Sequence, residues 1–303
     1  MLTPEREKWH MNRRQFHTLS LGVAAGFAME PMHGAKKINS VINGVTIGAQ
    51  SYSFRDRDIG AAIRAFADTG IGLCELWAGH LERGHGGTNS PADRARLRAW
   101  REGVALKEIE LVGQKFRAAG VTPYALNYSF RDDFSDREIE RGFEMAKALG
   151  AKVVTASSNV STAARIDPFA KKHRMRVGMH NHSQIEENEF ATPESFERAR
   201  RGQSEYIAIN LDIGHFTAAN FDPVDYIQKH HDDILTLHIK DRKRDQGANM
   251  PFGKGDTPIR EVLTLLRDNK YGIPANIEYE YGGSDAVEEV RRCLSYCRKA
   301  LEI

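Results

Sequence analysis

A regular alternation of short apolar runs with helical patterns limits the folds open to this chain more than any other feature. Because such an alternation is typical of parallel βα units, eight units between residues 36 and 303 predict a single-domain α/β (β/α)8 TIM barrel. The eight runs of strand length are Val45–Ser51, Gly72–Trp77, Val121–Asn127, Lys152–Ser157, Arg176–His182, Tyr206–Ile213, Ile234–Lys240 and Ala275–Glu280. An open doubly wound sheet is the alternative, but no glycine-rich phosphate turn follows an early strand.

Several of the intervening segments carry signals for helix ends. Ser135 and Glu138 form a capping-box pattern at the start of one predicted helix. Thr257 is expected to cap another, with Pro258 at its first helical position. Residues 285–303 supply a last amphipathic helix.

The charge and the cysteines exclude some functions. The formal net charge is only +2, and no basic stripe occurs, so nucleic acid is not an expected partner. The three cysteines have neither metal-type spacing nor the even number of a disulfide framework. Cys293 and Cys297 lie four residues apart on the last predicted helix, which favours packing.

The first 35 residues differ in kind from the rest. Arg13 and Arg14 precede an apolar stretch, Leu19–Met29, that is too short to span a bilayer comfortably. This pattern is typical of a twin-arginine export signal. We therefore expect residues 1–35 to form the signal, the export machinery to be a partner, and the protein to be periplasmic or otherwise exported. A frayed amphipathic arm is the alternative interpretation.

The ends of the later predicted strands are rich in groups that bind metals. They offer His180 and His182, then Asp212 and His215, then His238 and Lys240, and finally Glu278 and Glu280. In a barrel the carboxyl ends of neighbouring strands meet at one mouth, where catalytic groups collect. Each of these side chains alone has an ordinary structural explanation. Together they predict one divalent metal ion: Mn, Zn, Co, Fe or Mg.

Here the sequence resembles the xylose isomerase-like TIM barrel superfamily, often called the sugar phosphate isomerase/epimerase family. The resemblance rests on "LDIGH", "LHIKD", the "GKGD" turn at Gly253–Asp256 and the closing strand with Glu278. It implies that Asp212, His238 and Glu278 bind a metal. It also implies that His215 and Arg244 contact a carbohydrate substrate.

The chain departs from that family at one ligand position. The family's first metal-binding Glu is replaced by His180, which would be the fourth ligand. Relatives with two metal-binding Glu residues isomerise or epimerise ketoses with one base on each face. Glu278 is therefore the expected base here, with Glu280 or Glu75 as alternatives. A single base suits a 1,2-shift or a β-elimination, as in a lyase or hydratase of 3-keto-glycosides.

The pentapeptide YSFRD occurs twice, at residues 52–56 and 128–132, each time after a predicted strand. Its aromatic residues either stack on a sugar ring or only plug the end of the barrel, and its arginines either bond hydroxyls or remain in solvated turns. From these and the neighbouring strand ends, we expect substrate contacts from Tyr52, His80, His182 and Lys240.

Two other kinds of protein compete with a sugar isomerase, epimerase or lyase. One is a non-catalytic carbohydrate-binding barrel, which would need no metal. The other is a nuclease of the endonuclease IV type, but that site needs more His and carboxylate ligands, and the near-neutral charge opposes it. The sequence is also compatible with a homo-oligomer.

Overall fold

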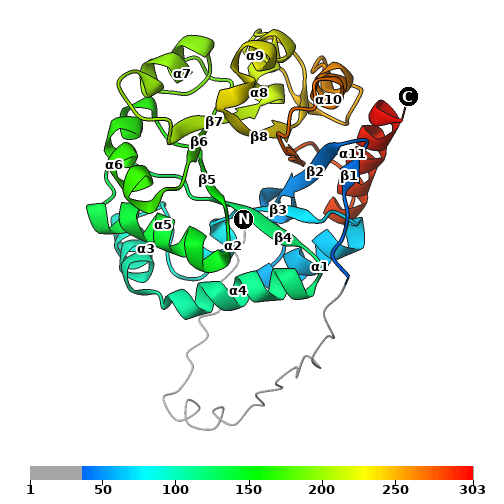
Figure 1. The fold of residues 1–303 in the computed structure, drawn as a ribbon. Helices are drawn as coiled ribbons and strands as arrows, with labels where there is room; N and C mark the ends of the chain where they lie inside the picture. The colour runs from blue at the N-terminus through cyan, green and yellow to red at the C-terminus, as the bar shows by residue number, and fades with distance from the viewer. Residues whose placement is uncertain (1–35, 303) are drawn as a thin grey trace, which may run out of the picture. The chain divides into compact units, whose positions relative to one another are not determined.

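The computed structural model describes residues 36–302, and within them it contains a closed barrel of eight parallel strands surrounded by helices (Figure 1). Strand order around the barrel follows the sequence, and pairing of β2 with β3 closes it. The predicted (β/α)8 fold is therefore confirmed. The barrel strands are β2 Val45–Gln50, β3 Leu73–Trp77, β4 Thr122–Asn127, β5 Val153–Ala156, β6 Val177–His180, β7 Ile207–Asp212, β8 Ile234–Ile239 and β11 Ala275–Ile277.

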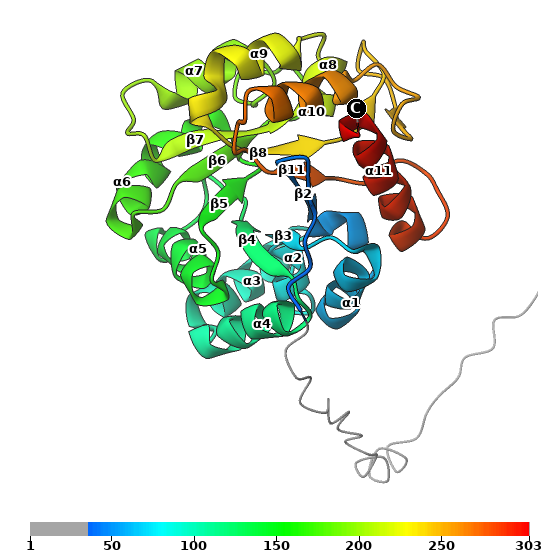
Figure 2. The same cartoon turned by 45° about the vertical axis from the view of Figure 1, so that its right-hand side comes forward.

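The helices pack around the outside of these strands, with α10 and α11 lying side by side next to the closing strands (Figure 2). Apolar side chains face the strands and the polar face of each helix is left to solvent. The α-helices are α1 Ile59–Thr69, α2 Gly79–Glu82, α3 Pro91–Gly103, α4 Leu106–Ala118, α5 Asp136–Leu149, α6 Ala163–His173, α7 Pro193–Arg200, α8 Ile213–Ala218, α9 Pro223–His230, α10 Ile259–Asp268 and α11 Ala286–Leu301. Short 3₁₀ turns occupy Ser51–Phe54, Val160–Thr162 and His231–Asp233.

Of the two predicted helix caps, the one at α5 is confirmed and the one at α10 is wrong. The capping box at α5 is present, with Ser135 and Glu138 each bonded to the other's backbone amide. The predicted cap at α10 is wrong, because Pro258 is the N-cap residue and no side chain caps the helix. The Thr257 hydroxyl instead accepts a hydrogen bond from the amide of Arg242, 3.0 Å away. This competing partner explains why the sequence pattern misleads.

Three elements go beyond the simple alternation. A hairpin joins β1, Val41–Ile42, to β2 through Asn43 and Gly44, both at positive φ as a tight two-residue turn requires. A second hairpin pairs β9, Asp241–Arg242, with β10, Asn249–Met250. Between β3 and β4 the chain forms three helices, α2 to α4, and this long excursion builds one wall of the barrel mouth.

Both cysteines of α11 are buried and free, as expected from the packing interpretation. From Lys36 to Glu302, no helix combines the length and the apolar character that crossing a membrane requires. The predicted signal, residues 1–35, lies outside the described residues.

Candidate functional site

Four strand ends bring together the residues expected to bind a metal. His180 ends β6, Asp212 ends β7, His238 lies in β8, and Glu278 directly follows β11. The strand register places His238 opposite Asp212 on one side and Asn276 on the other. One potential ligand atom from each of the four residues lies within 4.8 Å of the other three, and all four side chains are buried.

The hydrogen bonding of this cluster fits a bound cation. Ten buried side-chain atoms of the described residues have no hydrogen-bond partner, and four of them belong to this cluster: Nε2 of His180, Oδ2 of Asp212, Nδ1 of His238 and Oε2 of Glu278. Leaving buried polar atoms without a hydrogen bond is costly. The Lys240 ammonium offsets this cost for the two carboxylate oxygens, and a bound cation would supply a partner to the two imidazole nitrogens. Two imidazole nitrogens and two carboxylate oxygens form a donor set that suits divalent transition metals.

Neighbouring groups fix the orientation of each donor. The Ser157 hydroxyl lies 3.3 Å from Nδ1 of His180, which leaves Nε2 of that ring for the cluster. Asp212 uses its other oxygen, Oδ1, to accept from the amide of His215 at the start of α8. The Asn181 side chain bonds both backbone groups of Asp212 and so holds the end of β7 in place.

Glu75 takes a different position from the one expected of a base. Its side chain is fully buried inside the barrel and accepts hydrogen bonds from Gln50, Thr155 and Asn276. Both carboxylate oxygens also lie 2.9 Å from Nε2 of His238. Because Nε2–H then donates to a carboxylate, Nδ1 of His238 keeps its lone pair for a metal. Glu75 is thus placed to orient His238, and it does not face a substrate cavity.

Lys240 adds a positive charge beside the two carboxylates of the cluster. Its ammonium lies 3.2 Å from Asp212 and 2.9 Å from Glu278, and it also contacts Glu280. Burial alone would lower the pKa of Lys240, but these three carboxylates raise it above its ordinary value. Burial likewise opposes ionisation of Glu278, yet Lys240 and His238 hold the pKa of its carboxyl well below its usual range. Lys240 therefore stays charged and Glu278 stays ionised.

A cavity of about 380 Å³ opens above the cluster, lined by several of the expected substrate contacts. Burial, followed by the nearby His180, lowers the pKa of His182 to about 4. Burial and Lys240 also keep the pKa of His215 well below its ordinary value. Both imidazoles are thus neutral near pH 7. The expected contacts that line this cavity are Tyr52, His182, His215 and Lys240.

Two expected contacts lie elsewhere. His80 is buried in α2, with Nε2 3.1 Å from the Ser51 carbonyl oxygen. Its ring lies edge-on to Trp77, so it supports this cavity-lining residue without lining the cavity itself. Arg244 is exposed in the turn between β9 and β10, and it does not line the cavity. Arg242 reaches inward instead, with Nη1 2.7 Å from Nδ1 of His215. The β9–β10 hairpin, which sequence spacing does not reveal, decides which arginine points into the barrel.

The two copies of YSFRD both follow barrel strands, but few of their side chains face the cavity. Phe54, Tyr128 and Phe130 are buried in the hydrophobic core, so they plug the barrel wall. Tyr52 and Arg131 do line the cavity. The interpretation as an aromatic plug therefore holds for the three buried residues, whereas substrate contact by Tyr52 stays a prediction.

Two residues at this mouth were not expected from the sequence. Trp77 ends β3 and Asn127 ends β4, and both line the cavity. Their place at the carboxyl ends of barrel strands is the signal that would have identified them.

Comparison with known proteins agrees with this architecture. A family model described as xylose isomerase-like TIM barrel matches residues 63–299, and the chain belongs to that family. No curated protein matches the sequence.

Several solved structures share the fold at low sequence identity. A sugar phosphate isomerase/epimerase from Parabacteroides distasonis is 17% identical, with a TM-score of 0.61 over 88% of this chain and 99% of the other. The E. coli 3-keto-D-glucoside 4-epimerase is 15% identical, with a TM-score of 0.64 over 84% and 99%. The IOLI protein, solved with a bound zinc atom, is 13% identical, with a TM-score of 0.62 over 85% and 99%. At these identities the likeness establishes the fold alone.

Proposed function

We propose that this protein is a divalent-metal-dependent enzyme that removes a proton next to the carbonyl group of a keto-sugar. The observation that carries the proposal is the buried cluster of His180, Asp212, His238 and Glu278, in which each residue offers one potential ligand atom beneath a cavity. A divalent ion held by these residues would polarise the carbonyl oxygen and so acidify the neighbouring C–H. Solved neighbours that act on sugars support the choice of substrate class.

The residues around the cluster suit proton abstraction by a carboxylate. Glu278 is ionised and lies at the cavity, so it can accept a proton, and Glu280 is the other carboxylate that lines this cavity. Lys240 touches both and remains charged, so it donates hydrogen bonds and offsets negative charge that develops on the substrate. His182 and His215, both neutral, can bond the substrate's hydroxyl groups.

The replacement of a carboxylate by His180 limits the outcome of the reaction. An imidazole nitrogen that gives its lone pair to a metal cannot also accept a proton. Glu75, the other candidate, is fully buried and already saturated with hydrogen bonds. The face near His180 therefore lacks a strong base, which favours return of the proton to the same face.

Loss of a β-leaving group is the second outcome that one base allows. After the proton leaves, the electron pair of the C–H bond can expel a glycosidic oxygen two carbons from the carbonyl carbon. The products are then an unsaturated keto-sugar and the released alcohol. A lyase of 3-keto-glycosides is thus the alternative reaction for the same site.

Running the reaction in heavy water and following where deuterium enters the product distinguishes these two reactions. We expect the metal-loaded protein, mixed with a panel of keto-hexoses and methyl 3-keto-glucosides, to place deuterium next to the carbonyl with retention, or to release methanol. Mass spectrometry and proton NMR measure both results. Efficient inversion with deuterium in the inverted product would refute the one-base proposal, and the absence of both deuterium exchange and methanol release with every probe would refute the enzyme proposal. A non-catalytic sugar-binding barrel would bind the sugars without exchange and without needing metal.

Two variants locate the base. Glu278→Gln should abolish exchange, but it also removes a ligand, so its metal content must be measured in parallel. Glu280→Gln leaves all four ligands intact. Loss of exchange in the Glu280 variant at full metal content would assign the proton transfer to Glu280 instead.

We also propose that the protein is exported by the twin-arginine route, on the basis of Arg13 and Arg14 before Leu19–Met29. That pathway reads the guanidinium pair, so replacing both arginines with lysine should retain the protein in the cytoplasm. Fractionation of cells carrying each form measures this. An unchanged periplasmic yield would overturn the proposal.

A further inference from the structure

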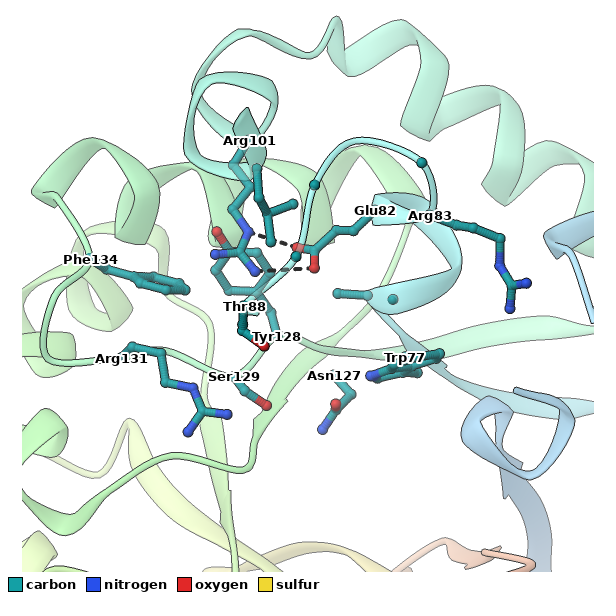
Figure 3. Close-up of a pocket in the computed structure, with 16 residues that line it drawn as sticks. Trp77, Glu82, Arg83, Thr88, Arg101, Asn127, Tyr128, Ser129, Arg131 and Phe134 are labelled. Atoms are coloured by element: carbon teal, nitrogen blue, oxygen red, sulfur yellow. Dashed lines mark hydrogen bonds and ion pairs between the residues drawn. The ribbon is translucent and has the colours of Figure 1, made fainter. Parts of the chain in front are cut away.

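A second and larger cavity lies beside the one above the metal-type cluster (Figure 3). Its volume is about 520 Å³, and the excursion between β3 and β4 forms much of its wall. We call it the side cavity. Four residues line both cavities and form their common border: Trp77, Asn127, Ser129 and Arg131. A molecule larger than one sugar ring could therefore extend from the cluster into the side cavity without crossing the barrel wall.

Ion pairs hold the wall of the side cavity in shape. Arg101 of α3 forms two hydrogen bonds with Glu82 of α2, at 2.7 and 3.1 Å, as Figure 3 shows. The same guanidinium lies over the ring of Phe134 at 4.6 Å. Glu138 of α5 accepts from both Arg98 and Arg101 and so links α3 to α5. These links span α2, α3 and α5, so the cavity is a built feature of the fold.

The border between the cavities carries groups that suit a sugar. The indole of Trp77 is pressed against Gly79, where an added Cβ would lie 2.2 Å from the ring, so its plane is fixed. Flat aromatic rings pack against the apolar faces of sugar rings. The Arg131 side chain is exposed and makes no hydrogen bond or ion pair to any residue between Lys36 and Glu302, and in Figure 3 its guanidinium lies beside Ser129. Its donors are free to bond hydroxyl groups.

The side cavity does not present a buried cluster of cations. Arg101 is neutralised by Glu82 and by Glu138, whereas Arg83, which bonds only the neutral carbonyl of Arg55, and Arg131 keep their charge but are exposed to solvent. Arg131 is thus the lining arginine that keeps its donors for a ligand, whereas sites for phosphate usually gather several cations or backbone amides. An uncharged polyhydroxylated ring fits one free guanidinium next to an indole.

We propose that the side cavity binds the second glycosyl unit of a glycoside whose keto-sugar ring lies above the metal-type cluster. This inference rests on the proposed function and specifies its substrate class as a disaccharide-sized glycoside. Each cavity by itself has a volume within the range of about 300 to 1,000 Å³ that is usual for small-ligand sites. The smaller one takes the reacting ring, and the larger one takes the neighbouring ring.

Filling the side cavity without touching the cluster tests this proposal. Gly87 lines the side cavity but not the smaller one, and a Cβ added there meets no atom within 4 Å. Gly87→Phe therefore adds a ring at the wall of the side cavity without a clash at its Cβ, and Thr88→Phe offers a second way to narrow the cavity. Gly272→Phe is the matched control, because Gly272 has equally open surroundings and precedes β11 at the other end of the barrel.

Calorimetry on the metal-loaded full chain gives a readout that needs no turnover. The probes are maltose, cellobiose and trehalose, each compared with methyl glucoside. We expect at least one disaccharide to bind the unmodified protein about tenfold more tightly than methyl glucoside. Gly87→Phe or Thr88→Phe should remove this difference while leaving methyl glucoside binding within about twofold, and Gly272→Phe should preserve it.

The outcomes separate this inference from the proposed function. A disaccharide preference that survives filling of the side cavity, or the lack of any preference across the probes, overturns the inference. Failure of both deuterium exchange and methanol release with every keto-sugar overturns the proposed function but leaves the binding comparison valid. Circular dichroism and the thermal midpoint confirm that each variant is folded.

Discussion

The two halves of the barrel mouth are built in opposite ways. On the side of β6, β7, β8 and β11, charged and imidazole groups are buried and constrain one another, as in the chain of contacts from Glu75 through His238 to Glu278. On the side of β2, β3 and β4, aromatic and neutral polar groups border two open cavities. A buried charge tolerates no loss of its partner, whereas an open cavity tolerates changes in shape. The first half should therefore control metal binding and chemistry, and the second should control which substrate is accepted.

The largest effect is expected where a ligand of the buried half is removed. Asp212→Asn or His238→Ala should abolish tight metal binding and activity together, because each removes one of four donors. Elemental analysis of the purified variants measures bound metal. His231→Ala is the control, since His231 stacks on Tyr271 ahead of β8, at the other end of the barrel. Full metal occupancy in both ligand variants would contradict the assignment of the site.

A smaller loss of metal affinity is expected when the residue changed is Glu75, which contacts the ligand His238 but is not itself one of the four donors. Glu75→Gln keeps the volume of the side chain but removes the carboxylate that orients His238. Loss of such a partner typically weakens metal binding about 10- to 100-fold. Competition with a metal-chelating dye measures the dissociation constant, and the thermal midpoint checks folding. Glu280→Gln provides the comparison, because Glu280 contacts Lys240 but is not one of the four donors. Equal affinities in the two variants would show that Glu75 does not orient the ligand.

The protonation of His238 gives the third expected effect. Burial lowers its pKa, but Glu75 and then Glu278 raise it well above its usual value of 6.5 in the metal-free protein. A raised pKa means that this group stabilises the fold below pH 6.5 and that the contribution is lost as the pH rises through the folded-state pKa. A metal needs the neutral ring, so metal binding at pH 7 should release about one proton from this residue.

Calorimetric titration in two buffers of different ionisation enthalpy measures the protons released on metal binding. Glu75→Gln removes the largest contribution that raises the pKa of His238. Metal binding to this variant should therefore release fewer protons than metal binding to the unmodified protein. Identical heats in both buffers for the unmodified protein would mean that His238 is already neutral at pH 7.

The buried half of the mouth was the more predictable of the two. His180, Asp212, His238 and Glu278 lie at or next to strand ends, and a periodic strand pattern fixes such positions directly. The side cavity depends on contacts that have no period, such as the pairing of Arg101 with Glu82 across 19 residues. Pairs of this kind, between residues distant in the sequence, form only when the chain has folded, so no local sequence pattern predicts them.

Loop geometry also explains the residues whose position differed from expectation. The resemblance to the family pointed to Arg244, but the β9–β10 hairpin turns Arg242 toward His215 and leaves Arg244 exposed. Glu75 ends in the barrel interior because alternate residues of a barrel strand face inward. Which inward residue reaches the cavity and which stays beneath it depends on packing, and the alternation alone does not decide it.

The smallest expected effect compares the arginines of the two YSFRD copies. Nη1 of Arg55 bonds the carbonyl oxygens of Tyr52 and Tyr279, at 3.2 and 3.0 Å, so this arginine ties the first copy to the end of the barrel. Arg131 lies on the border of both cavities and makes no such bond within residues 36–302. Arg55→Ala should thus lower the free energy of unfolding by about 1–2 kcal/mol, whereas Arg131→Ala should change it by less than about 0.5 kcal/mol. Chemical denaturation measures both values, and calorimetry with the disaccharide probes should show the reverse order, with binding weakened in the Arg131 variant. If Arg131→Ala were as destabilising as Arg55→Ala, the two copies would share one structural role, and the contrast between the two halves of the mouth would not extend to this motif.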